Sequence, residues 1–326
     1  MRLVLAILFA PLFIFSQDYP QDYFQSPLDV PLDVSGSFGE LRSNHFHSGL
    51  DFKTKGVEGL PLYAAGDGYI SRIKISTFGY GKAIYITHPN GYTSVYGHLQ
   101  KANGAIESFI KARQYKEQSY EVEMYLYPTE LPVKKGDVIA FSGNTGGSGG
   151  PHLHFEFRNT KSEEILNPMH FGFKKIIKDE RKPVIQGLVA YPLDSTTVNN
   201  SQKPINISFS KQSDGSYLGV KVKADGKVAF GINAYDFCTN AYNKNGLYKV
   251  RAYLNGVLQY QYGFDGFAFD ESRYINNFID YERFHLMGQR VQKLFQISEY
   301  PLSIVAENKK DGTIKVQPGA NYNYRV

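Results

Sequence analysis

Two histidines stand one residue apart in the stretch GGPHLHFEF, as His152 and His154. The residues around them alternate as in a β-strand, in which successive side chains point to opposite faces. Both imidazoles are therefore expected on one face, about 7 Å apart along the backbone. Neutral imidazole binds metal ions and transfers protons near neutral pH. The pair is either two polar side chains exposed by chance or part of a metal or proton-transfer site.

Three other residues could belong to the same site. His47 and Asp51 lie four positions apart in NHFHSGLDF, and His98 ends the run YTSVYGH. In a straight strand, positions four apart are separated by about 13 Å, which is too far for one metal ion. A kink at Gly49, where the missing side chain lowers its cost, would bring His47 and Asp51 together.

A catalytic zinc ion takes three protein ligands and keeps one position open for water. Spacing alone does not choose three ligands from the five candidates, and a site that uses both histidines of the pair is also geometrically allowed. His45 would share a strand face with His47 and could line the site. The other histidines have no chemical partner nearby in the sequence and are predicted to be structural or on the surface: His88, His170 and His285.

Composition favours strands and turns over helices. The 326 residues include 25 Tyr, 23 Phe and 31 Gly but no Trp. The net charge of +5 suits an anionic partner but is too weak and diffuse to indicate nucleic acid. The single cysteine, Cys238, excludes an intramolecular disulfide and is predicted to be a small buried hydrophobic residue.

The N-terminus reads MRLVLAILFAPLFIFSQ, with one arginine before an apolar run. This run is too short to span a bilayer and is typical of a secretory signal peptide, over residues 1–16. No cysteine follows that could carry a lipoprotein anchor. We therefore expect export to the periplasm or the extracellular space, with no stable membrane insertion after cleavage.

Residues 38–182 are predicted to form one β-rich domain after an N-terminal segment, 17–37. LYAAGDGYISRIKIS, KAIYITH and YTSVYGHL read as successive strands, and Asn90-Gly91 indicates a hairpin turn. Residues 100–132 are predicted to insert a helix and a strand. The loop GNTGGSGG lacks the G-K-[ST] ending of a phosphate loop and is interpreted as a tight turn that leads into the strand of His152 and His154.

A basic run, KKIIKDERKP, marks a domain boundary before residue 183. Residues 183–326 are predicted to form an antiparallel β-sandwich, and FDESRYINNFIDYERFH is expected to be partly helical. The chain stops on an alternating run without a closing turn, which is compatible with a longer parent protein. Four dipeptides are read as turns: Asp214-Gly215, Asp225-Gly226, Asn255-Gly256 and Asp311-Gly312.

Four runs occur in a characteristic order: HSGLD, GLPLYAAGDGYI, GYGKAIYITHPNGYTSVYGHL and VKKGDVIAFSGNTGGSGGPHLHFE. Together they resemble the lysostaphin-type (LytM-like) zinc metallopeptidases over roughly residues 38–168. The resemblance implies His47, Asp51 and His154 as Zn²⁺ ligands, with His152 and His98 as catalytic residues. Residues 183–326 resemble immunoglobulin-like accessory domains only weakly.

The residue types suit that chemistry. Zinc lowers the pKa of its bound water towards 7. The chain has no H-E-x-x-H glutamate to take the proton, so a histidine must do so, and His152 is placed for it beside His154. His98 is expected to help zinc stabilise the oxyanion formed from the amide.

The resemblance implies an exported endopeptidase that cuts the peptide cross-links of peptidoglycan, with stem peptides as partners. Two alternatives stay open: a metal-free peptidoglycan-binding regulator of other hydrolases, and a zinc peptidase that acts on proteins outside the wall. The insertion at 100–132 either walls the groove or pads the surface. Residues 183–326 are expected to be a positioning module whose deletion leaves activity on soluble muropeptides.

Overall fold

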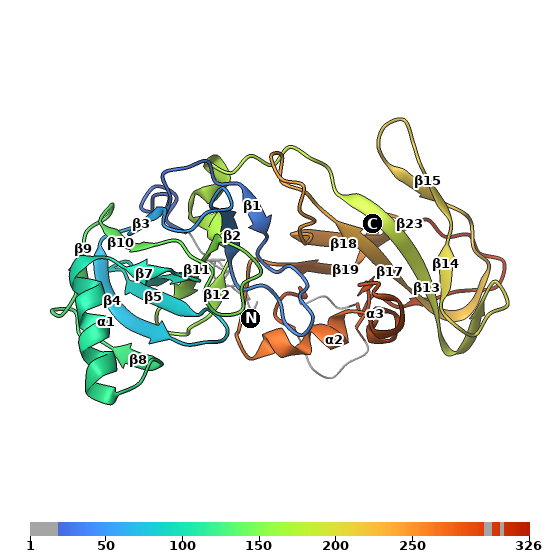
Figure 1. Cartoon of the computed structure of the whole chain (residues 1–326). Helices are drawn as coiled ribbons and strands as arrows, with labels where there is room; N and C mark the ends of the chain where they lie inside the picture. Colours follow the sequence, from blue (N-terminus) through green and yellow to red (C-terminus); the bar gives the residue numbers. More distant parts are fainter. Residues whose placement is uncertain (1–18, 297–301, 307–309) are drawn as a thin grey trace, which may run out of the picture.

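The computed structural model describes residues 19–296, 302–306 and 310–326. The predicted signal peptide lies outside the described residues. Figure 1 shows a first part, coloured blue to green, beside a second part of yellow to orange sheets, with α2 and α3 below the sheets of the second part. Within the described residues, no helix has the length and apolar character needed to cross a membrane.

The first part is built on a ten-stranded antiparallel sheet with the order β1-β2-β11-β6-β5-β4-β8, to which β9, β12 and β20 pair. Its strands are β1 Val34–Gly36, β2 Leu50–Lys53, β4 Gly68–Ile75, β5 Lys82–Thr87, β6 Tyr92–Gly97, β8 Val122–Tyr125, β9 Pro132–Val133, β11 His152–Asn159, β12 Ile165–Leu166 and β20 Gly266–Phe267. A three-stranded sheet lies beside it: β3 Pro61–Tyr63, β10 Val138–Phe141 and β7 Lys101–Ala102.

Strand β11 lies in the middle of the main sheet and shows strict alternation. Leu153, Phe155 and Phe157 are fully buried in the apolar core. The intervening side chains, from His152 to Arg158, therefore share the opposite face. The pairing of β11 with β2 sets His154 opposite Asp51, and its pairing with β6 sets His154 opposite Gly97.

Several local predictions are confirmed. The Asn90-Gly91 turn joins β5 to β6 as an antiparallel pair. The insertion contains a helix, α1 Gly104–Glu117, and the edge strand β8, which pairs with β4. The run LYAAGDGYISRIKIS differs, because it forms two strands: β3 pairs with β10 in the small sheet, whereas β4 pairs with β5 in the main sheet.

The second part is also mainly β, but an immunoglobulin-like sandwich is not confirmed. A five-stranded sheet has the order β14-β13-β17-β21, with β22 also on β17, beside a two-stranded and a three-stranded sheet. The strands are β13 Val184–Val198, β14 Ile205–Ile207, β15 Phe209–Lys211, β16 Tyr217–Gly219, β17 Ala224–Tyr235, β18 Lys249–Leu254, β19 Val257–Gly263, β21 Gln292–Lys293, β22 Ile314–Lys315 and β23 Tyr324–Arg325.

The predicted turns have different outcomes. Asp214-Gly215 connects β15 to β16, and Asn255-Gly256 connects β18 to β19. The prediction for Asp225-Gly226 is wrong, because both residues lie within β17, where a register shift against β13 accommodates Gly226 at a φ of 74°.

The segment expected to be partly helical contains three short helices: η3 Glu271–Tyr274, α2 Ile275–Phe278 and α3 Tyr281–Met287. Two other 3₁₀ turns follow β12: η1 Pro168–Phe171 and η2 Phe173–Lys175.

The two parts share one apolar core. Strand β20, from beyond residue 183, pairs with β12 and so extends the main sheet. The ring of Phe46 lies 5.3–5.9 Å, centroid to centroid, from those of Phe264, Phe267 and Phe278. The segment before the first predicted ligand is therefore packed against residues that are distant in sequence.

Candidate metal centre

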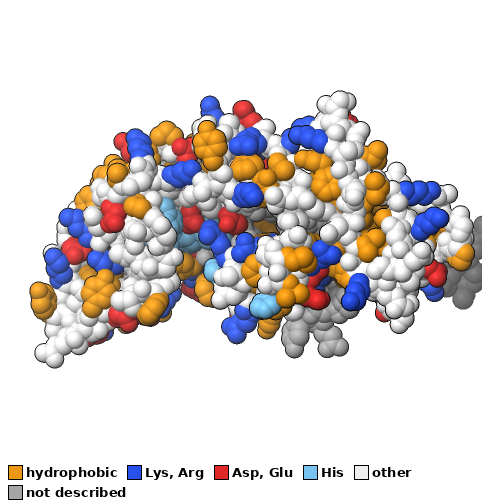
Figure 2. All heavy atoms as spheres, turned by 45° about the vertical axis from the view of Figure 1, so that its right-hand side comes forward, with side chains coloured by type: hydrophobic (Ala, Val, Ile, Leu, Met, Phe, Trp, Pro, Cys, Tyr) orange, Lys and Arg blue, Asp and Glu red, His pale blue; other side chains and the backbone are white. Residues whose placement is uncertain are grey.

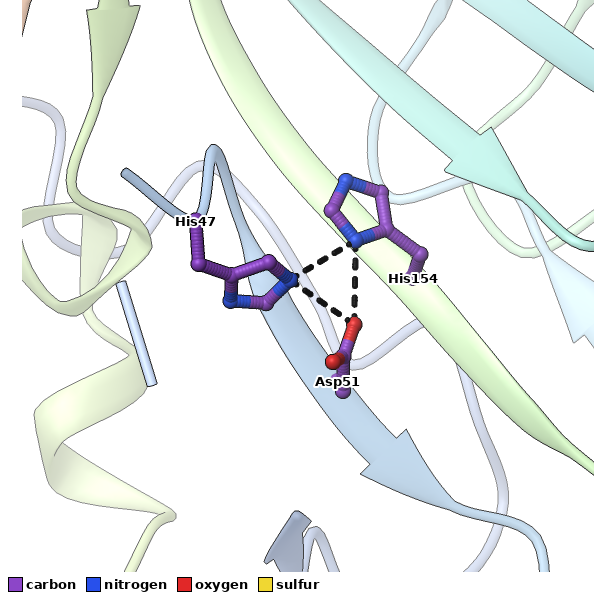
Figure 3. Close-up of side chains that lie close together, drawn as sticks. All are labelled: His47, Asp51 and His154. Atoms are coloured by element: carbon purple, nitrogen blue, oxygen red, sulfur yellow. Dashed lines mark hydrogen bonds and ion pairs between the residues drawn. The ribbon is translucent and has the colours of Figure 1, made fainter. Parts of the chain in front are cut away.

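Three polar side chains converge at the junction of β2 and β11. Figure 3 shows His154 on β11, Asp51 on β2, and His47 on the segment that leads into β2. Asp51 Oδ1 lies 3.0 Å from His47 Nε2 and 3.0 Å from His154 Nδ1. The two nitrogens are 3.1 Å apart. All three residues are buried, and their donor atoms face one another.

The approach of His47 to Asp51 depends on Gly49. The chain bends at this residue just before β2 begins, as the sequence suggested. Gly49 also packs directly on β11, where any side chain would collide with the carbonyl oxygen of Phe155. Glycine is therefore required here by close backbone approach.

Neighbouring groups determine which ring nitrogen of each histidine faces the centre. His47 Nδ1 donates to the carbonyl oxygen of Ser37 at 2.8 Å, which leaves the Nε2 lone pair free. His154 Nε2 donates to Glu156 Oε1 at 2.8 Å, so the Nδ1 lone pair is free once the ring is neutral. Arg42 donates to Asp51 Oδ2 at 3.0 Å and so holds the carboxylate with Oδ1 inward. Metal-binding histidines in proteins are oriented by such partners.

The geometry of this cluster fits a tetrahedral metal ion. Zinc binds histidine nitrogen and carboxylate oxygen at about 2.0–2.2 Å, which places tetrahedral ligand atoms about 3.3 Å apart. The three donor atoms lie at 3.0–3.1 Å and need to separate only slightly. Two imidazoles and one carboxylate leave a fourth position, as in catalytic zinc sites.

The cluster is strongly charged in the metal-free chain. Burial disfavours a charged His154, but its hydrogen bonds to Asp51 and Glu156 outweigh burial and raise its pKa to about 9. Burial opposes ionisation of Asp51 as well, yet the three histidines around it hold the pKa of this carboxyl well below its usual range. A proton on His154 therefore takes the place of part of a metal's charge.

Glu156 lies behind His154 and is fully buried. It accepts hydrogen bonds from Ser48 at 2.6 Å, from Tyr80 at 2.5 Å and from Arg158 Nε at 2.8 Å. Burial would raise the pKa of Glu156, but Arg158 and His154 lower it further than burial raises it. The spacing of the candidate ligands did not indicate this network, although the alternation of HLHFEFR already places Glu156 and Arg158 on the face of His154.

His152 and His98 stand beside the cluster, with ring centroids 4.6 Å apart. His152 Nε2 lies 3.5 Å from Asp51 Oδ1, and its Nδ1 donates to the carbonyl oxygen of Gly150 at 2.8 Å. His98 Nδ1 donates to the carbonyl oxygen of Thr145 at 2.8 Å. Burial, together with the other histidines, lowers the pKa of His98 to about 4. Both rings therefore have Nε2 free of hydrogen when neutral.

The glycine-rich loop supplies the two carbonyl groups that orient these rings. Thr145 and Gly150 both belong to GNTGGSGG, and Gly146, at a φ of 73°, packs against the backbone of Gly81. The loop thus leads into β11, as predicted, and also orients the two histidines. The sequence gives no direct signal of this second role.

The remaining histidines lie outside the cluster. His45 is exposed at the rim of the groove into which the cluster opens. His88 is buried between the Asp67 carbonyl and Ser94. His170 pairs with Asp265, and His285 stacks on Tyr281.

The cluster opens into a groove of about 1140 Å³. Figure 2 shows histidine side chains in a hollow, with acidic and basic side chains beside them. Arg72 and Lys74 of β4 line the groove, and Glu123 of the insertion strand β8 contacts both. The insertion therefore positions cations of the groove wall.

The comparison with known proteins agrees with this geometry. Residues 45–115 and 121–168 match the sequence profile of Peptidase family M23. An uncharacterized metalloprotease of Haemophilus influenzae is 37% identical over 111 residues, which is 34% of this chain and 18% of that protein. The DD-carboxypeptidase/endopeptidase Mpg of Neisseria meningitidis serogroup B is 35% identical over 36% of this chain and 21% of its own length.

A third relative, the peptidoglycan DD-endopeptidase ShyC of Vibrio cholerae, is 33% identical over 34% of this chain and 20% of its own length. The catalytic domain of lysostaphin from Staphylococcus simulans aligns with 48% of this chain and 92% of its own, at 26% identity and a TM-score of 0.30. The chain spans about a fifth of the length of these three curated relatives.

Within residues 45–168, the sequence is therefore similar to Peptidase family M23, the lysostaphin-type metallopeptidases. The His47–Asp51–His154 cluster lies within this segment and is intact.

Proposed function

We propose that the chain is an exported, zinc-dependent endopeptidase that hydrolyses peptide cross-links of peptidoglycan in the cell envelope. The observation that carries the proposal is the convergence of His47, Asp51 and His154, with a free lone pair or carboxylate oxygen on each, beside two further histidines. An oriented donor set next to proton acceptors is what metal-assisted amide hydrolysis requires.

Zinc, when bound by His47, Asp51 and His154, would supply Lewis acidity that lowers the pKa of water and polarises the scissile carbonyl. His152 accepts the proton of the attacking water at Nε2, because its Nδ1 hydrogen is held by Gly150. The same ring then donates that proton to the leaving amine nitrogen.

We propose a role for His98 that differs from the one expected from the sequence. Donation to an oxyanion needs a hydrogen on Nε2, but the Thr145 carbonyl holds the ring hydrogen on Nδ1, and burial disfavours the doubly protonated ring. We therefore propose that His98 accepts a hydrogen bond from the water or the substrate and so helps His152 to orient the water.

The substrate class rests on the family and on relatives named as peptidoglycan DD-endopeptidases. We propose the D-alanyl–diaminopimelate bond as the one cleaved. Purified peptidoglycan would be digested with the zinc-loaded chain, and the released fragments identified by mass spectrometry. Cross-linked dimers should become monomers with a new D-alanine carboxyl group.

The metal-free regulator and the protein-directed peptidase give different results in that digest. A regulator would bind peptidoglycan without releasing fragments, and it would not need the intact ligand cluster. A peptidase that acts on proteins outside the wall would leave the cross-links uncut but would cleave added protein. Either result would contradict the proposed cleavage of peptidoglycan cross-links.

A further inference from the structure

One wall of the groove comes from outside the segment that matches the M23 family. The lining residues include Phe269, Ser272 and Arg273, which lie far beyond residue 168, where the match ends. These residues lie just after β20, in the loop and the η3 turn. The second part of the chain thus forms part of the surface that a substrate meets.

This wall is firmly attached to the metal centre. Ser272 is buried, and its hydroxyl accepts from the backbone N–H of Phe46 at 2.8 Å and donates to the Phe46 carbonyl oxygen at 3.2 Å. Phe46 directly precedes the ligand His47. Strand β20 anchors the other end of the wall through its pairing with β12. The wall is therefore positioned at one end by the Ser272 hydroxyl on the Phe46 backbone and at the other end by strand pairing.

The groove is rich in cations. Among the residues that the structure describes, two carboxylates, Asp51 and Glu163, line it, against five cations: Arg42, Arg72, Lys74, Arg158 and Arg273. The first four cations pair with carboxylates of the chain. Arg273 is exposed and donates from Nε to the carbonyl oxygen of Asp270 at 3.2 Å, and it forms no ion pair within the described part of the chain. Its remaining guanidinium hydrogens are available to a ligand.

An exposed aromatic ring lies close to this arginine in the sequence. Phe269 is 59% exposed and lines the groove, and the guanidinium of Arg158 lies 5.6 Å from its ring centroid. A large apolar side chain at a groove wall offers a packing surface for the aliphatic part of a ligand. Phe269 and Arg273 together suit a ligand with an alkyl chain and a carboxylate.

We propose that residues 266–274 form a substrate-recognition wall, on which Arg273 binds a carboxylate of an anionic peptide and Phe269 packs against the adjacent alkyl chain. This inference rests on the proposed function, because stem peptides that contain diaminopimelate carry both groups. A planar guanidinium binds a carboxylate through two parallel hydrogen bonds, which explains an arginine at this position.

The test compares two forms of one cross-linked muropeptide, with its side-chain carboxyl groups free or converted to amides. Arg273→Gln should raise KM for the free acid about tenfold and leave kcat nearly unchanged, because a charge-assisted hydrogen bond is lost on binding. KM for the amidated form should not change, and Arg273→Lys should retain part of the effect. Arg251→Gln, at an exposed arginine outside the groove, serves as the control and should match the wild-type chain.

Binding of an un-cross-linked stem tetrapeptide, measured by calorimetry, gives a second readout that needs no hydrolysis. Arg273→Gln and Phe269→Ala should each weaken it, whereas Arg251→Gln should not. Equal KM changes for acid and amide, or unchanged tetrapeptide binding, would overturn the recognition wall. If the wild-type chain cleaves neither substrate, the proposed function fails, and tetrapeptide binding still decides the role of Arg273.

Discussion

His154 Nε2 lies 2.8 Å from Glu156 Oε1, two residues further along the same face of β11. This contact holds the His154 ring with Nδ1 towards Asp51 and His47. Glu156 is in turn fixed by Arg158, Ser48 and Tyr80. One strand face thus provides a metal ligand, the carboxylate that orients it and the cation that balances the carboxylate.

Glu156→Gln should lower zinc affinity by about 10- to 100-fold, the usual cost of losing a partner that orients a metal-bound histidine. The amide keeps the size of the side chain but loses the charge that favours a basic His154. Affinity would be measured by competition with a chelator. Glu163→Gln is the matched control, because Glu163 contacts Arg158 from an exposed position. Equal affinities for the two variants would contradict the role given to Glu156.

Zinc binding should release protons and strengthen as pH rises towards 9. In the metal-free chain, hydrogen bonds to Asp51 and Glu156 overcome burial and raise the pKa of His154 to about 9, above its usual 6.5. A ligand must be deprotonated, so about one proton per zinc should leave His154 between pH 6.5 and 9. Calorimetry in buffers of different ionisation enthalpy measures this number. A value near zero would mean that His154 is neutral before the metal arrives.

The raised pKa of His154 also makes the free energy of unfolding of the zinc-free chain depend on pH. Because the folded pKa of His154 is raised, its contribution is fully present below pH 6.5 and is lost as pH rises through about 9. Urea unfolding of the metal-free chain should therefore show a fall in the free energy of unfolding across that range. His154→Gln should remove this part of the pH dependence, and a fall that persists in the variant would assign it to another group.

Deleting residues 183–326 should destabilise the remaining domain, contrary to the expectation from the sequence. The deletion removes β20 and exposes Phe46, which packs on Phe264, Phe267 and Phe278. Phe267→Ala alone should lower the free energy of unfolding by about 3–5 kcal/mol in urea denaturation. Phe78→Ala, at an 80% exposed site, should change it by less than about 0.5 kcal/mol. A stable, folded truncated domain would contradict the shared core.

Much of the site could be predicted because its determinants are local. The alternation around His152 and His154 is a property of one strand, and Gly49 signals the bend before Asp51. The neighbours of these residues could not be predicted from spacing. The pairing of β2 with β11, which sets Asp51 opposite His154, is a contact between segments about a hundred positions apart.

The recognition wall shows where local patterns stop being informative. The segment that contains Ser272 and Arg273 was correctly expected to be partly helical, yet its contact with Phe46 joins positions 226 apart. No pattern of period 2 or 3.6 indicates which distant segment completes a groove. The turn expected at Asp225-Gly226 is wrong for a related reason, since such dipeptides also occur at irregularities within long strands.

The zinc content of purified His152→Ala and His154→Ala tests the account most directly. A ligand contributes to metal affinity, whereas a proton acceptor contributes mainly to the transition state. His154→Ala should lose most of its zinc, as should His47→Ala and Asp51→Ala. His152→Ala should keep nearly one zinc per chain while its activity falls by about two to four orders of magnitude. A zinc-free His152→Ala, or a fully loaded His154→Ala, would contradict the assignment.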